Sequence, residues 1–141
     1  MKKLLAIILI SFSMSFVSAQ DKSEPIDSSQ YAWLYIYRSD KFDLGIVKYD
    51  LKLNDSTLCT IRNHNRFIIP VKQFGPGMLS AEMEFKIKLK VDLKPGEKYY
   101  IWCSLNPGLI VSNPRLTLAK PEKGPKEFDK AKGVINEKLN Q

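Results

Sequence analysis

The stretch FKIKLKVDLKPGEKYYIWCSL, residues 85–105, decides the fold class. Its first half alternates strictly, with apolar residues at the odd-numbered positions from Phe85 to Leu93 and charged residues between them. A period of two is typical of a β-strand with one buried face. The turn Pro95-Gly96 then separates this strand from a second apolar run, residues 98–105. The stretch therefore predicts two consecutive strands.

A local motif lies at the junction of these two strands. The spacing of Leu93, Pro95, Gly96 and Tyr99 resembles the L-x-P-G-x-x-Y corner of fibronectin-type and related sandwiches. There the hydroxyl of a tyrosine that begins a strand hydrogen-bonds to the preceding loop, and this fixes how the chain crosses between sheets. The alternative is an ordinary Pro-Gly turn before a strand.

Further short apolar runs occur on both sides of this stretch, with turn residues between them. They are residues 31–38, 46–53, 58–62, 66–71, 78–84 and a last extended run through 115–120. Aromatic and β-branched residues fill them and Gly/Pro breaks recur, which argues against helices. Pro70 lacks a ladder donor, so residues 66–71 are expected to be an edge strand or to end there. Seven or eight strands at turn spacings of about ten residues predict an all-β domain, an antiparallel two-sheet sandwich over residues 31–120.

The last segment, residues 121–141, changes to helical spacing. Pro125 suits a first helical position, and apolar residues then recur on one side, namely Phe128, Ala131, Ile135 and Leu139. The pattern predicts a linker followed by a C-terminal amphipathic helix. Gly133 weakens that helix, so it needs a surface to lie on.

The first residues have the features of a secretory signal peptide. Lys2 and Lys3 precede a short apolar run that ends at Val17-Ser18-Ala19, which predicts cleavage after Ala19. The run falls short of the roughly 20 apolar residues of a membrane span, which disfavours the alternative of an uncleaved anchor. No cysteine follows it, so no lipid anchor is expected. The exported chain is expected in the periplasm or outside the cell, without a transmembrane span, and residues 20–30 read as a flexible lead-in.

Composition excludes several classes of function. The 141 residues suit a single domain, and charged residues at 26% with apolar residues at 44% argue against a disordered chain. Two cysteines and one histidine exclude a zinc site of cysteines alone and a centre with several histidines, and no metal or other cofactor is expected. The net charge of +7 falls once residues 1–19 are removed, and it predicts no nucleic-acid partner.

Aromatic residues occupy the face opposite the aliphatic residues in two of the runs. If the aliphatic faces line the core, the outer faces carry Tyr31, Trp33, Tyr35, Tyr37, Tyr100 and Trp102. Soluble proteins rarely expose a large apolar patch, so this aromatic face is expected to be covered or to bind something. The tail covers it through Phe128, Ile135 and Leu139, or a partner or second copy binds it, or it is a carbohydrate platform. The candidate binding residues are Trp33, Tyr35, Tyr37, Tyr100 and Trp102.

Cys59 and Cys103 are both expected in the core, because alternation places each on an aliphatic face of its strand. Export permits a disulfide between them, worth roughly 3–4.5 kcal/mol on the chain-entropy model. Two buried thiols are an equal alternative.

Two polar features have a plain interpretation. His64 lies in the polar turn Asn63 to Arg66 and reads as a solvated loop residue rather than a catalytic base. A row of lysines is expected on a solvated outer face, where it would also protect an edge strand against aggregation: Lys86, Lys88, Lys90 and Lys94. The alternative is that they bind an anionic partner such as an acidic glycan.

Four segments together resemble the bacterial family called domain of unknown function 2846. They are AWLYIYR (32–38), the Pro76-Gly77 turn, LKPGEKYYI (93–101) and PRLTLAK with KEFDKAK (114–132). The resemblance implies an exported or envelope-associated sandwich of the immunoglobulin-like or prealbumin-like kind, with no assigned activity and no catalytic residues. Many of these proteins look like lipoproteins, whereas this chain lacks the cysteine that anchoring requires.

The sequence as a whole predicts an exported, non-enzymatic β-sandwich module that binds a protein or glycan, or gives structural support, in the bacterial envelope. The alternative is a glycan or peptide receptor that uses the aromatic face. The identity of the partner and the oligomeric state stay open.

Overall fold

The computed structural model describes residues 26–39, 47–106 and 112–137. The predicted signal peptide, residues 1–19, lies outside this range, as do the first residues of the lead-in and Leu139. Residues 26–30 of the lead-in include a short 3-10 helix, Ser28–Gln30, whose preceding residue Asp27 accepts a hydrogen bond from the Ser29 amide over 3.0 Å.

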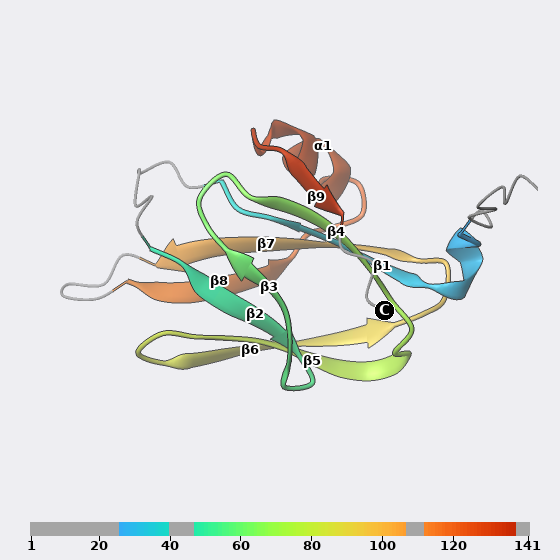
Figure 1. The fold of residues 1–141 in the computed structure, drawn as a ribbon, viewed down its shortest axis with the longest axis horizontal. Coiled ribbons are helices and arrows are strands. Elements are labelled where there is room, and N and C mark those ends of the chain that lie inside the picture. Colours follow the sequence, from blue (N-terminus) through green and yellow to red (C-terminus); the bar gives the residue numbers. More distant parts are fainter. Residues whose placement is uncertain (1–25, 40–46, 107–111, 138–141) are drawn as a thin grey trace, which may run out of the picture.

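The described residues form two sheets and one α-helix (Figure 1). The strands are β1 (Ala32–Tyr37), β2 (Tyr49–Leu53), β3 (Ser56–Ile61), β4 (Arg66–Val71), β5 (Gly75–Glu82), β6 (Lys86–Leu93), β7 (Lys98–Asn106), β8 (Asn113–Leu118) and β9 (Ile135–Glu137), and the helix is α1 (Gly124–Lys130). Sheet A has the order β8-β7-β1-β4-β9 and sheet B the order β3-β2-β5-β6. The prediction of a mainly β chain with two sheets is confirmed, and the arrangement is sandwich-like.

The prediction of purely antiparallel pairing is wrong for sheet A. β1 pairs parallel with β7, and β4 pairs parallel with β9, while the pairs of sheet B are all antiparallel. The period of two in a strand is the same for both directions of pairing, so it assigns faces and not neighbours. The prediction that residues 66–71 form an edge strand or end at Pro70 is wrong, because β4 lies between β1 and β9 and continues to Val71. The pairing with β9 ends at Ile68, so among the described residues no strand needs the missing donor of Pro70 on that side.

The core lies between the two sheets and contains the predicted aliphatic faces. Its fully buried side chains include Leu34, Ile36, Leu51, Leu53, Ile61, Ile69, Leu79, Leu93 and Ile101. Cys59 of sheet B and Cys103 of sheet A are buried in it as expected, and no disulfide joins them in the structure. Phe85 departs from the expected pattern: it precedes β6 in the turn after β5 and is 60% exposed.

The tyrosine corner predicted between β6 and β7 is present. The Tyr99 hydroxyl donates to the carbonyl oxygen of Asp92 over 2.8 Å and accepts from the Lys94 amide over 2.9 Å. Gly96, in the turn between them, has a φ of +78°, which a residue with a side chain rarely adopts. The side chain of Tyr99 thus ties the end of β6 in sheet B to the start of β7 in sheet A.

Tyr99→Phe is expected to lower the free energy of unfolding by about 1–3 kcal/mol, because it removes one donor and one acceptor that serve the backbone of this turn. Chemical denaturation measures the loss. The matched control is Tyr31→Phe, which removes a hydroxyl from a part-buried tyrosine outside the corner and is expected to change stability by no more than about 0.5 kcal/mol. Equal effects of the two substitutions would contradict a structural role for the corner.

The predicted C-terminal helix is present but shorter than expected. It ends at Lys130, and Ile135, expected on its apolar side, lies instead in β9. Gly133 explains the difference, because a side-chain carbon there would collide with the carbonyl oxygen of His64. The chain needs glycine at this close approach, and it leaves the helix to run beside β4. Within the described ranges, no helix is long and apolar enough to cross a membrane.

Candidate functional site

The outer face of sheet A carries the aromatic residues, and α1 lies across it (Figure 1). Phe128 is the centre of this contact and is only 3% exposed. Its ring centroid lies 5.2 Å from that of Tyr35, 6.0 Å from that of Tyr37 and 6.3 Å from that of Tyr100. All three ring pairs meet edge to face, the favoured geometry for aromatic side chains.

Polar groups hold the tail in place around this aromatic contact. The Tyr37 hydroxyl donates to the Glu127 carboxylate over 2.6 Å. The Arg66 guanidinium donates from Nε to the carbonyl oxygen of Gly133 over 2.9 Å and from Nη1 to that of Phe128 over 3.4 Å. Burial raises the pKa of Tyr37 above its ordinary value, and the Glu127 carboxylate raises it further.

The helix begins in direct contact with the sheet. A side-chain carbon on Gly124 would come within 2.5 Å of the Tyr100 side chain, so only glycine allows the helix to start this close to the ring. Gly124 and Gly133 therefore bracket the tail with two close approaches. We call residues 124–137 the tail cover.

The structure brings together four of the five candidate aromatic residues. Tyr35, Tyr37, Tyr100 and Trp102 all belong to or pack against the cluster that contains Phe128, and Tyr37 is 1% exposed. Trp33 is not part of this cluster: its ring neighbours that of Tyr31, and its Nε1 donates to the carbonyl oxygen of Ser28 over 2.9 Å.

Of the three tail residues expected to dock on this face, Phe128 does so, whereas Ile135 is 40% exposed in β9 and Leu139 lies outside the described residues. The arrangement corresponds to the expectation that the chain's own tail covers the aromatic face.

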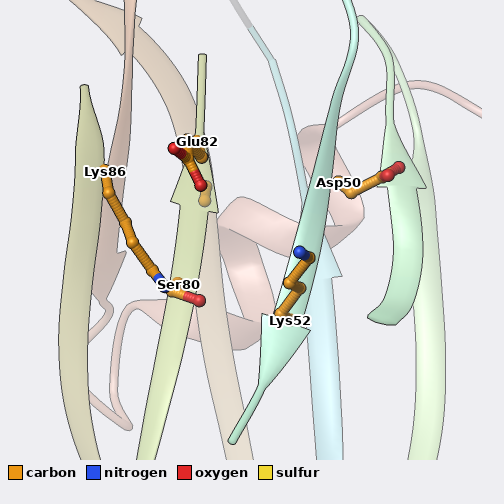
Figure 2. A pocket seen from close by; sticks show the side chains of 6 residues that line it. Asp50, Lys52, Ser80, Glu82 and Lys86 are labelled. Atoms are coloured by element: carbon orange, nitrogen blue, oxygen red, sulfur yellow. The ribbon is translucent and has the colours of Figure 1, made fainter. Parts of the chain in front are cut away.

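The outer face of sheet B carries polar depressions, and Figure 2 shows side chains that line one of them. One depression, of about 260 Å³, is lined by Asp50, Lys52, Ser80, Ala81, Glu82 and Lys86. An adjoining depression of about 350 Å³ shares Ser80 and Lys86 and adds Asn54, Asp55, Met78 and Lys88. We call the two together the sheet B groove.

Ser80 forms the floor of the sheet B groove between two lysines. It pairs in register with Lys52 on β2 and with Lys88 on β6, and it is 3% exposed. Neighbouring strands lie about 4.8 Å apart, so the two lysines flank the Ser80 hydroxyl from both sides. In Figure 2 the Lys86 side chain points toward Ser80.

The groove also contains three carboxylates, and two of them, those of Asp50 and Asp55, have polar partners. Asp55 forms an ion pair with Lys86, with 3.5 Å between Oδ1 and Nζ. Asp50 accepts a hydrogen bond from the Thr60 hydroxyl over 2.6 Å. Lys52 and Lys88 form no ion pair with the described residues. Of the described carboxylates, none therefore forms an ion pair with either of the two lysines beside Ser80.

Two residues of this groove, Lys86 and Lys88, were among the lysines that the sequence analysis singled out. It placed Lys86, Lys88 and Lys90 on one outer face, and the structure confirms that all three lie exposed on β6, an edge strand of sheet B. Lys94 lies beyond the end of β6. Ser80 and Lys52 were missed, because their period-two position assigns them an outer face but not their places beside Lys88.

The other candidate groups do not form a centre. His64 is exposed in its turn, with a φ of +57°. Among the residues that the structure describes, no group of three or more His, Cys, Asp or Glu side chains could hold a metal ion. No family model, no curated protein and no solved structure matches the chain.

Proposed function

We propose that the chain is an exported, non-enzymatic β-sandwich module that binds a partner molecule of the bacterial envelope through the outer face of sheet B. One observation carries the proposal: the two outer faces of the sandwich differ. That of sheet A is occupied by the tail cover, centred on Phe128. On that of sheet B the described residues leave a groove uncovered, with Ser80 on its floor and lysines on both sides.

The strand order supports the kind of sandwich that the family resemblance implies. In an immunoglobulin constant domain the first strand lies beside the second, in the same sheet. Here β1 lies between β7 and β4, and β2 belongs to the other sheet. This order favours a prealbumin-like sandwich over an immunoglobulin-like one.

Export is tested by expressing the full chain in a bacterium and measuring its intact mass in each cell fraction. The expected product is an exported protein that begins at Gln20, because cleavage follows Ala19. Ala19→Arg is the control, since a charged residue at the cut site should block processing. A cytoplasmic wild-type protein of full-length mass would contradict export.

Binding is tested by co-sedimentation of the purified exported protein with isolated envelope fragments. Saturable binding is expected for the wild type and is expected to fall in the double variant Lys52→Glu/Lys88→Glu. Lys90→Glu makes one such substitution on β6 outside both depressions and is expected to keep binding. Binding that is equal in all three proteins would contradict a site on the sheet B groove.

The second candidate function is a glycan or peptide receptor on the aromatic face. It is favoured by Trp102, whose indole nitrogen is buried beside the tail cover and has no hydrogen-bond partner among the described residues. Buried polar groups are normally hydrogen-bonded, so a ligand that placed an acceptor beside this nitrogen would gain binding free energy. A panel of glycans that quenches the fluorescence of Trp102 in a Trp33→Phe background would support this function, and an unquenched Trp102 would exclude it.

A further inference from the structure

We infer that the sheet B groove takes an acidic saccharide, with the carboxylate, sulfate or phosphate group of the sugar seated over Ser80 between Lys52 and Lys88. The inference rests on the proposed function, because it names the class of ligand for the same site. It goes beyond that function in assigning the anion to one position in the groove.

The position of the anion follows from charge. Lys52 and Lys88 flank Ser80 in register, and neither forms an ion pair with the described residues. Two cations held on adjacent sides of one residue repel each other, and an anion between them removes this repulsion. Each ammonium has three donors and the serine hydroxyl has one, so an oxyanion placed there can accept charge-assisted hydrogen bonds from three side chains.

The saccharide follows from the rest of the lining. The two depressions, of about 260 and 350 Å³, share Ser80 and Lys86 and form a trough longer than a single oxyanion needs. Glu82 and Asp50 lie beside the anion position, and ionised carboxylates act only as acceptors. A ligand that fits therefore combines one anionic group with several hydroxyl donors, which is the chemistry of an acidic sugar.

Nucleic acid and acidic peptides fit this groove less well. Single-stranded nucleic acid is bound through aromatic side chains on which the bases stack, and none lines either depression. A peptide with several carboxylates would meet Glu82, Asp50 and Asp55 along the trough. A saccharide spaces its anionic groups apart and presents hydroxyls between them.

The test is calorimetric titration of the purified exported protein with three dextrans of equal length: dextran sulfate, carboxymethyl dextran and neutral dextran. Binding is expected for at least one anionic dextran and not for the neutral one. Lys52→Gln/Lys88→Gln is expected to weaken that binding at least about tenfold, because two charge-assisted contacts are lost. Lys90→Gln is the control for a single lysine outside both depressions, and its affinity is expected to stay within about twofold of wild type because exposed charges outside the site contribute little.

The control experiments separate the site from a diffuse charge effect. Binding of neutral dextran equal to that of the anionic ones would overturn the anion position, and so would an equal loss in Lys90→Gln and in the double variant. If inorganic sulfate competes as effectively as dextran sulfate at the same concentration of sulfate groups, the site recognises the anion alone, and the assignment to a saccharide is overturned. The affinity of the wild type is also expected to fall as salt is raised, because dissolved ions screen the charges and the Debye length is only about 10 Å at 0.1 M. An affinity that does not change with salt would contradict the inference.

The two anionic dextrans distinguish the source of the ligand, because sulfate and carboxylate groups occur on different envelope glycans. Failure of all three dextrans together with groove-dependent binding to envelope fragments would overturn the saccharide and leave the proposed function intact. If the protein does not bind envelope fragments but binds dextran sulfate saturably and through the two lysines, the proposed function is overturned and the saccharide site is kept.

Discussion

Phe128→Ala is expected to destabilise the protein by about 3–5 kcal/mol, the range for truncating a buried phenylalanine. The side chain is 3% exposed and meets the rings of Tyr35, Tyr37 and Tyr100 edge to face. Truncation removes apolar burial and leaves a cavity under α1. The helix has only seven residues, so it depends on this contact rather than on its own propensity.

Two measurements check this prediction. Chemical denaturation gives the change in the free energy of unfolding, and acrylamide quenching in a Trp33→Phe background reports how far Trp102 becomes exposed when the tail cover loosens. Phe85→Ala is the matched control, because Phe85 is 60% exposed and its truncation should change stability by no more than about 0.5 kcal/mol. A Phe128→Ala protein as stable and as weakly quenched as Phe85→Ala would show that the tail does not cover the aromatic face.

The tail cover gives an example of tertiary contacts overriding local sequence pattern. The spacing of Phe128, Ala131 and Ile135 fits one face of a helix, and the first two are indeed buried beneath α1. Ile135 follows Gly133, whose position against His64 leaves no space for a side chain. Helical spacing thus identified the surface that docks, and a backbone contact with a loop far away in sequence decided where the helix ends.

The sequence indicated which face of each strand is buried, but it did not indicate which strands pair with one another. Strict alternation placed Val91 and Leu93 inward and Lys88 outward, as found. The motif ending in Tyr99 predicted a particular hydrogen bond, because all of its members lie within one turn. The alternation along β6 and the tyrosine corner both depend on residues that are close together in the sequence, so the sequence alone predicts them.

Pairing between distant segments follows from the whole chain instead. Nothing in residues 32–37 indicates that β1 runs parallel to β7, because both directions of pairing show the same period. The sheet B groove was incompletely predicted for the same reason: Lys52, Ser80 and Lys88 come from three strands. Their adjacency exists only once β5 lies between β2 and β6.

Alkaline solution is expected to destabilise the protein, and Tyr37 is the main reason. Burial first, and then the hydrogen bond to Glu127, raise the pKa of Tyr37 above its ordinary value of 10.0. Below about pH 10 the phenol is neutral in the folded and unfolded states alike, so its contribution to stability is complete. Above that pH the unfolded chain ionises and the folded one does not, so stability falls as pH rises.

The expected loss is up to about 1.4 kcal/mol for each pH unit above 10 from this one group. The pKa values of Tyr99 and Tyr100 are also raised, chiefly by burial, and they add to the loss. Denaturation midpoints measured from about pH 8 to about pH 11.5 test this in the wild type and in Tyr37→Phe. The two proteins are otherwise identical, so the difference between the two curves isolates Tyr37. The variant is expected to lose less stability per pH unit, and parallel curves would show that the Tyr37 hydroxyl ionises as readily in the folded chain as in the unfolded one.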